Sequence, residues 1–260
     1  MKINPAPTLE NLGGKGYQLT QLSKLFSVPP FFVIQFDTID EIQNKENQKA
    51  ILQTFEQNKF DVVSVRSSAT VEDSNTASFA GMFETELYVT KDNLISAIEK
   101  VLQSTTDSRV KEYCKLNNID YNSIKMCVVV QKMINSRIAG VCITRERKDS
   151  NTMLLEACLG LGEGIVSGAV TPDTYTIDRK TFLVKSKNIG YQKTMITDKG
   201  EIAIPFFLRS SMKMTDSEIV QLTKVCLQIE QKLGYLSADI EWAFENDKLY
   251  ILQSRAFVGL

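Results

Sequence analysis

The spacing of short apolar runs changes near residue 124, and this change constrains the fold more than any other feature of the sequence. Before it, predicted helices alternate with short strands. After it, strand-like runs follow one another closely, over 125–133, 138–144, 152–159, 174–177 and 182–184. The sequence therefore predicts an α+β fold of two lobes, 1–124 and 125–260, joined near residues 120–135.

The helices and strands of the first half are predicted from apolar periodicity and from stop signals. The predicted helices cover 17–26, 37–57, 93–103 and 108–116, and the predicted strands cover 31–34, 61–66 and 82–89. Thr215, followed by Glu218, is typical of a capped helix start. That helix is expected to run through Leu233 and to stop at Gly234.

The chain of 260 residues contains no histidine, and its 30 basic and 31 acidic side chains give a formal net charge of −1. Histidine-based triads, histidine-ligated zinc or haem and phosphohistidine are therefore excluded for this polypeptide. A near-neutral charge supplies no basic field for binding nucleic acid. The five cysteines are widely spaced, the first residues lack the apolar run that is typical of a signal peptide, and no apolar run in the sequence is long enough to span a membrane. These features predict a cytoplasmic protein without membrane association.

A lysine stands among three glycines at 13–16, Gly-Gly-Lys-Gly, within a predicted loop over 11–16. Glycines let backbone amides approach an anion closely, and a helix that begins directly afterwards adds the positive end of its dipole. Lys15 would supply a point charge for a phosphate. A plain turn with an exposed lysine accounts for the same residues, so the segment alone leaves both interpretations open.

Arg66 ends an apolar strand at the point where that strand leaves the core. Its guanidinium is suited to phosphate contact through two parallel hydrogen bonds. The following loop, 67–81, is rich in small and hydroxyl-bearing residues and could donate backbone amides to a polyphosphate. A solvent loop at the end of an edge strand is the alternative, and these residues alone favour it.

A closing β-hairpin is predicted from the strands 239–244 and 249–253 and a turn between them. Side-chain alternation places Glu241 and Gln253 next to each other across the hairpin. A carboxylate beside an amide oxygen is a ligand set that suits Mg²⁺, and Arg255 would reach a terminal phosphate. A surface hairpin with a polar wet face is the alternative.

The apolar run 126–130 ends abruptly in Gln131, Lys132 and Met133. A buried strand that leads into an exposed linker is a natural hinge between two lobes. Its backbone can hydrogen-bond an adenine edge while Met133 packs on the face of the base. The pattern therefore indicates a nucleotide-binding hinge.

These motifs follow one another along the chain as Gly-Gly-Lys-Gly, Val-Arg-Ser-Ser-Ala-Thr, Ser-Phe-Ala-Gly, Val-Gln-Lys-Met, Gly-Leu-Gly-Glu, Asp-Ile-Glu-Trp-Ala and Leu-Gln-Ser-Arg. In this order they resemble the nucleotide-binding domain of the phosphoenolpyruvate synthase and pyruvate phosphate dikinase family, which also occurs in rifampicin phosphotransferase. The resemblance covers about residues 12–256. It implies an ATP-grasp fold in which ATP, with Mg²⁺, is held between the two lobes.

The resemblance also implies roles for residues at the phosphate end of the nucleotide. Lys15, Arg66 and Arg255 are expected to bind the phosphates and to neutralise charge on the transferring group. Glu241 and Gln253 are expected to bind Mg²⁺ and, through it, the phosphates.

For the rest of the nucleotide, the resemblance places Gly81 and Thr85 in the loop and strand that lie over it. Gln131 and Met133 are expected at the adenine hinge. The segment 160–168 and the run Thr-Pro-Asp at 171–173 also match the family, without an assigned function.

Proteins of this family continue into a mobile domain with a phosphate-accepting histidine, whereas this chain stops shortly after Leu-Gln-Ser-Arg. We therefore expect an ATP-dependent phosphotransferase component that passes a phosphoryl group to a histidine of a partner protein or domain. In the mechanism that the resemblance implies, the histidine carries a pyrophosphoryl intermediate, which leaves AMP as the product. An ATP-grasp kinase or ligase acting directly on a small molecule, with ADP as the product, is one alternative. A non-catalytic nucleotide-binding module is the other.

Overall fold

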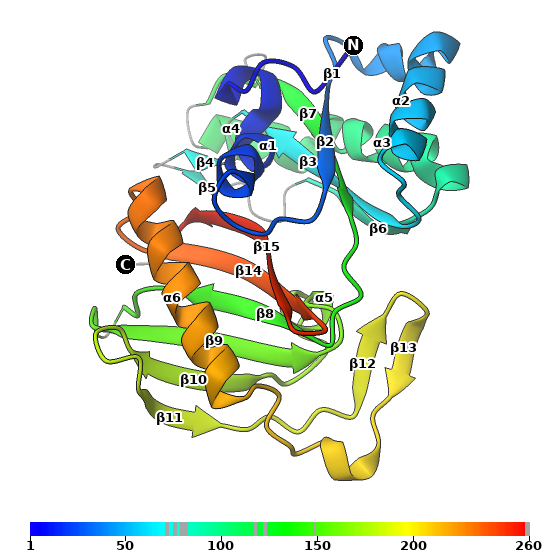
Figure 1. The fold of residues 1–260 in the computed structure, drawn as a ribbon. Helices are drawn as coiled ribbons and strands as arrows, with labels where there is room; N and C mark the ends of the chain where they lie inside the picture. The colour runs from blue at the N-terminus through cyan, green and yellow to red at the C-terminus, as the bar shows by residue number, and fades with distance from the viewer. Residues whose placement is uncertain are drawn as a thin grey trace. The chain divides into compact units, whose positions relative to one another are not determined.

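The computed structural model describes residues 1–70, 73–74, 77–78, 83–116, 119–121, 124–147 and 149–257 (Figure 1). The chain divides into two compact units. The first consists of Met1–Lys24 and Pro29–Met133, and the second of Leu25–Val28 and Ile134–Leu260. Both contain sheets and helices, so the predicted α+β class is confirmed.

The first unit is built on a five-stranded antiparallel sheet with the strand order β1-β2-β7-β3-β6. In that order the strands are Lys2–Ile3, Phe31–Gln35, Met126–Lys132, Val63–Ala69 and Thr85–Val89. The helices are α1 (Leu9–Ser23), α2 (Lys45–Gln57), α3 (Leu94–Gln103) and α4 (Ser108–Leu116), with the short 3₁₀ turns η1 (Ile39–Gln43), η2 (Lys91–Asn93) and η3 (Ser104–Thr106). A small pair, β4 (Asp73–Ser74) and β5 (Ala77–Ser78), completes the described elements.

Strand β7 explains where this unit ends. It pairs with β2 on one side and with β3 on the other, so both of its neighbours precede residue 124. The expected boundary after residue 124 assigns β7 to the other lobe, whereas the first unit contains it as far as Met133. The reason is that a change in strand density is a local signal, while strand pairing joins distant parts of the chain.

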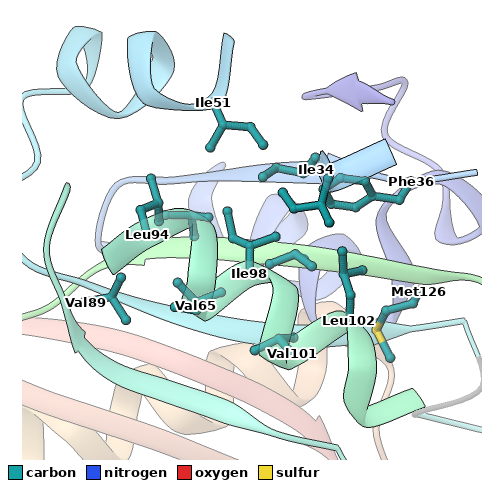
Figure 2. Packing of buried hydrophobic residues seen from close by; sticks show 14 of the residues in the cluster. Ile34, Phe36, Ile51, Val65, Val89, Leu94, Ile98, Val101, Leu102 and Met126 are labelled. Carbon is teal, nitrogen blue, oxygen red and sulfur yellow. The ribbon is translucent and has the colours of Figure 1, made fainter. Parts of the chain in front are cut away.

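One face of this sheet is covered by an apolar core. Figure 2 shows Ile34 and Val65 of the sheet meeting Ile98 and Leu102 of α3, with Ile51 of α2 beside them. All five side chains are almost completely buried. The strong apolar face of α3, with contacts at three- and four-residue spacing, explains why this helix forms where it was predicted.

Helix α1 differs from its prediction as a loop over 11–16 followed by a helix over 17–26. The helix runs from Leu9 to Ser23. Thr8 caps its N-terminus, because the Thr8 side chain accepts a hydrogen bond from the Asn11 backbone N–H. Only Gly13 departs from helical geometry, with φ 67° and ψ 178°. Gly13 therefore separates two helical segments, so the predicted break is present, but it occupies one residue instead of the whole of 11–16.

The second unit is built on a six-stranded antiparallel sheet with the strand order β11-β10-β9-β8-β14-β15. In that order the strands are Val184–Asn188, Asp173–Asp178, Thr152–Leu159, Ile138–Ile143, Ala238–Glu245 and Lys248–Ala256. The other elements are the pair β12 (Thr194–Thr197) and β13 (Gly200–Ala203), the turns α5 (Glu163–Val166) and η5 (Phe206–Leu208), and the helix α6 (Asp216–Leu233).

Helix α6 confirms its predicted start and end. Glu218 N donates to Thr215 Oγ1 at 3.3 Å, and Thr215 N donates to Glu218 Oε2 at 2.7 Å, which forms the capping box. Gly234 ends the helix in the left-handed conformation. In Figure 1 the helix, drawn in orange, lies along one side of the six-stranded sheet, and its apolar residues are buried.

The hairpin β12–β13 was not predicted. Its four-residue strands are half-buried or exposed and do not alternate cleanly between apolar and polar residues.

None of the helices in the described part of the chain combines the length and apolar content that crossing a bilayer requires. All five cysteines are buried and unpaired.

Candidate functional site

The glycine-rich segment of α1 packs against the end of strand β3. Ser68 Oγ donates to Leu12 O at 2.7 Å and accepts from Gly16 N at 2.9 Å. A Cβ atom on Gly13 would lie 1.9 Å from Ser68 O, so the contact requires glycine. These contacts fix the segment that contains Lys15 against the strand that carries Arg66, and Lys15 itself is half-buried.

Arg66 and Gln131 lie on the same face of the first sheet. Arg66 is opposite Val129, and Gln131 is opposite Ser64, so the two are diagonal neighbours across β3 and β7. Arg66 Nη1 donates to Gln131 Oε1 at 3.3 Å. The Gln131 side chain is only 2% exposed, and its Nε2 has no hydrogen-bond partner among the residues that the structure describes.

Three other residues of the first unit are predicted to contact the nucleotide, and the structure describes two of them, Thr85 and Met133. Thr85 is exposed and is the register partner of Arg66 on β6. Met133 N donates to Val62 O at 3.0 Å, and Met133 Sδ accepts from Tyr88 N at 3.1 Å. Gly81 lies outside the described residues.

In the second unit, the closing hairpin forms as predicted. Glu241 and Gln253 are register partners across β14 and β15, and a bulge follows between Glu241 and Trp242. The turn places Asn246 at φ 53°, a conformation that asparagine tolerates. Side-chain alternation along the two strands was therefore sufficient to predict that Glu241 and Gln253 pair across the hairpin.

Arg255 is held by a residue to which the sequence analysis gave no role. Its Nε and Nη2 donate to Asp239 Oδ2 at 2.8 and 2.6 Å, and the Asp239 side chain is 12% exposed. Burial raises the pKa of Asp239 above its ordinary value, although the Arg255 charge acts in the opposite direction. The signal for this role was present in the alternation Asp-Ile-Glu, which places Asp239 and Glu241 on one face.

A second missed carboxylate, Glu156, shares the face that carries Glu241. Val141 of β8 is opposite Glu241 on one side and opposite Glu156 of β9 on the other. Two strand spacings, about 9.5 Å between Cα atoms, therefore separate the two glutamates. The sequence could not reveal this because the strand order β9-β8-β14 joins residues more than 80 positions apart.

The donor set at Glu241 and Gln253 fits Mg²⁺. Both side chains offer oxygen, the ligand atom that Mg²⁺ prefers, and Mg²⁺ commonly takes one or two protein ligands and fills its remaining positions with water and phosphate oxygens. Among the described residues, no cluster of three or more histidine, cysteine, aspartate or glutamate side chains could hold a metal ion. Glu241 and Gln253 therefore suit a metal ion that is also bound by a ligand such as a phosphate better than a structural ion that is enclosed by protein side chains.

The Thr-Pro-Asp run at 171–173 has a structural role in the second unit. Asp173 Oδ1 is 2.9 Å from Lys213 Nζ, and both side chains are completely buried. Asp173 also accepts hydrogen bonds from Gly190 N, Lys213 N and the Tyr175 hydroxyl. One carboxylate thus fixes both ends of the segment 190–213, which contains β12 and β13.

Comparison with solved structures gives likenesses at low identity. PH1788 from Pyrococcus horikoshii Ot3 aligns with a TM-score of 0.48 and 12% identity, covering 91% of this chain and 86% of that chain. D-alanine–D-alanine ligase from Bacillus anthracis complexed with ATP aligns with a TM-score of 0.41 and 12% identity, covering 95% and 54%. At these values neither structure indicates a function for this chain.

Curated proteins give closer matches in sequence. A probable phosphoenolpyruvate synthase of Methanocaldococcus jannaschii is 37% identical over 206 residues, 76% of this chain and 17% of that protein. The phosphoenolpyruvate synthase of Pyrococcus furiosus is 36% identical over 233 residues, 83% and 28%. The rifampicin phosphotransferase of Bacillus cereus is 36% identical over 204 residues, 75% and 23%. The chain thus spans less than a third of the length of each of these relatives.

The sequence profile of one protein family matches residues 45–258, which include both strands of the hairpin, Arg66 and Gln131 but not Lys15. Its description is pyruvate phosphate dikinase, AMP/ATP-binding domain. This match covers most of the chain and agrees with the family that the order of motifs resembles. The chain belongs to the pyruvate phosphate dikinase AMP/ATP-binding domain family.

Proposed function

We propose that the chain binds Mg-ATP and acts as the nucleotide-binding component of a phosphotransferase. Family membership supports this proposal, together with the ATP-grasp fold that its motifs imply. The observation that carries it is the hairpin, where Glu241 faces Gln253 and Arg255 follows two residues later on the same strand. An oxygen pair and a guanidinium this close together suit a metal-bound polyphosphate.

Each proposed site residue has a distinct task. Glu241 and Gln253 would hold Mg²⁺, which when bound neutralises charge on the phosphate oxygens. Lys15, Arg66 and Arg255 bind the phosphates and oppose the charge that develops during transfer. Three further residues are proposed to contact the remainder of ATP: Thr85, Gln131 and Met133. Gly81 keeps its predicted role in the loop over the nucleotide.

We propose that the acceptor is a histidine of a partner protein or domain. The chain itself has no histidine. Attack by an imidazole nitrogen on the β-phosphorus forms the new P–N bond, breaks the bond from that phosphorus to the oxygen of the α-phosphate, and releases AMP. The γ-phosphate stays attached to the β-phosphate, so the histidine carries a pyrophosphoryl group after this step. In-line positioning and charge neutralisation supply the catalysis, as is general for phosphoryl transfer.

A small-molecule acceptor is the second candidate, and one observation favours it. A relative that is 36% identical carries the name rifampicin phosphotransferase. Direct transfer of the terminal phosphate to such a molecule would release ADP rather than AMP. The nucleotide product therefore separates the two candidates.

The test incubates the protein with Mg-ATP and a histidine-bearing domain produced from a relative, and separates the nucleotides by chromatography. AMP that forms only with the intact histidine supports the partner route. ADP that forms without the domain, and only when a small-molecule acceptor such as rifampicin is added, supports the small-molecule route. Glu241→Gln should abolish product formation in either case, because it removes the charge that holds the metal. Glu245→Gln on the same strand serves as the matched control. Full turnover by the Glu241→Gln enzyme would refute the metal assignment.

A further inference from the structure

Gln131 is a buried polar side chain whose two amide ends have different surroundings. Its Oε1 accepts from Arg66 Nη1 at 3.3 Å, while its Nε2 has no partner among the residues that the structure describes. The side chain is 98% buried. The strand beneath it is held in place, because Gln131 lies between Phe31 and Ser64 in the centre of the sheet.

The chemistry of Arg66 fixes the direction of this amide. A guanidinium has only hydrogen-bond donors, so the atom of Gln131 that faces it must be the carbonyl oxygen. The NH₂ group of Gln131 is thereby directed away from Arg66. Rotating the amide by half a turn would place two donors against each other and is unfavourable.

A buried donor without an acceptor is costly, and most buried polar groups in proteins are paired. A ligand atom that accepts from Nε2 removes this cost. Adenine ring nitrogens and ribose or phosphate oxygens are all acceptors, so ATP can supply one. The unpaired NH₂ group is therefore an observation that points to a ligand, in addition to the position of Gln131 beside a phosphate-binding arginine.

We propose that Gln131 is a positioning residue that couples nucleotide contact to phosphate binding. Its NH₂ group donates to the bound nucleotide, and its carbonyl holds the Arg66 guanidinium in the direction of the phosphates. This inference rests on the proposed function. It goes further in one respect, because it makes the contribution of Arg66 to phosphate binding depend on Gln131. A residue that only touched the base would not have this effect on a ligand without a base.

The test measures calorimetric binding of Mg-ATP and of Mg-tripolyphosphate, which has the phosphates but no base. Gln131→Met retains volume and removes both polar atoms. We expect Gln131→Met to lower the affinity for both ligands by about tenfold, because the loss of a hydrogen bond to a charged group has an effect of this order. In an Arg66→Met background, the same change at Gln131 should leave tripolyphosphate affinity unaltered.

Gln35→Met is the matched control. Gln35 lies on the same face of the same sheet, is 8% exposed, and donates to Asn11 Oδ1 at 3.3 Å. Its Oε1 is also buried without a partner among the described residues, so this control tests whether any unpaired buried amide affects binding; its loss should change stability but neither affinity. If Gln131→Met does not fold, Gln131→Asn retains an amide but withdraws it from Arg66 and makes the same test.

Two results overturn the inference and differ from each other. If Gln131→Met weakens Mg-ATP and leaves tripolyphosphate unchanged, Gln131 contacts the base alone and does not position Arg66. If the wild-type protein binds neither ligand, the proposed function fails, and the inference fails with it.

Discussion

Asp239 holds Arg255 through two hydrogen bonds to a single oxygen, with Nε at 2.8 Å and Nη2 at 2.6 Å from Oδ2. Asp239→Asn should lower Mg-ATP affinity by about fivefold to tenfold, because a neutral acceptor holds a guanidinium less firmly than a carboxylate does. Calorimetry measures this change. Asp247→Asn in the exposed turn of the same hairpin is the control, and equal losses in the two variants would contradict the role of Asp239.

The same pair predicts a pH dependence of binding. Burial raises the pKa of Asp239 above its ordinary value of 3.8, despite the opposing charge of Arg255. As the pH falls through this raised pKa, Asp239 gains a proton and releases Arg255. The ratio of wild-type affinity to Asp239→Asn affinity should therefore decrease on acidification, beginning above pH 3.8. A ratio that stays constant between neutral and acid pH would refute this coupling.

Glu230 predicts how acid affects the second unit. Burial tends to raise its pKa, but hydrogen bonds from Arg179 and Thr144 outweigh burial, and the pKa is lowered from 4.5. A lowered folded pKa means that the stabilisation is present above the unfolded value and is lost as the pH falls through the folded one. Glu230→Gln should therefore lower the free energy of unfolding at neutral pH by about 3 kcal/mol, since it leaves Arg179 without its buried partner, and the variant should unfold at a lower temperature. Thermal unfolding from pH 7 to pH 3 should show the difference narrowing with acid; a constant difference would be contrary to expectation.

Asp173 and Lys213 predict the behaviour of the segment 190–213. Both side chains are completely buried, so Asp173→Ala leaves the Lys213 charge without a partner. The free energy of unfolding should therefore fall by about 3–5 kcal/mol. Replacing Lys213 by Met as well should recover part of this loss, because it removes the buried charge. Limited proteolysis should cut the segment faster in Asp173→Ala than in the double variant. Equal cutting rates in all three proteins would show that the ion pair does not fix the segment.

Gly13 and Gly16 form a matched pair in α1. A Cβ atom added to Gly13 would lie 1.9 Å from the Ser68 backbone oxygen, and the Gly13 backbone has a φ of 67°. A Cβ atom added to Gly16 would lie 3.2 Å from the Val33 Cγ2 atom. Gly13→Ala should lower stability by more than about 2 kcal/mol, and Gly16→Ala by much less, because only Gly13 combines backbone overlap with left-handed geometry. Thermal unfolding of the two variants decides this, and equal losses would contradict the packing described for Ser68.

The sequence predicted most elements that have a strong local signal. The capping box at Thr215 and Glu218 and the hairpin that joins Glu241 to Gln253 were both confirmed. The pair β12–β13 was missed because its strands lack alternation, and the start of α1 was misplaced because the glycine run does not show that the break is confined to Gly13.

Contacts between distant strands could not be predicted. Arg66 and Gln131 are 65 residues apart and meet only because β7 lies next to β3 in the sheet. The position of Glu156 depends in the same way on the order of β9, β8 and β14. Each of these relationships follows from strand pairing, which alternation along one strand does not encode.

Titration of the protein with ATP, in the presence and absence of Mg²⁺, tests the central claim most directly. The wild-type chain should bind ATP, and Mg²⁺ should strengthen that binding. Glu241→Gln should retain the fold and lose the strengthening by Mg²⁺. A folded wild-type protein that does not bind ATP, or a Glu241→Gln variant with the same response to Mg²⁺ as the wild type, would contradict the account.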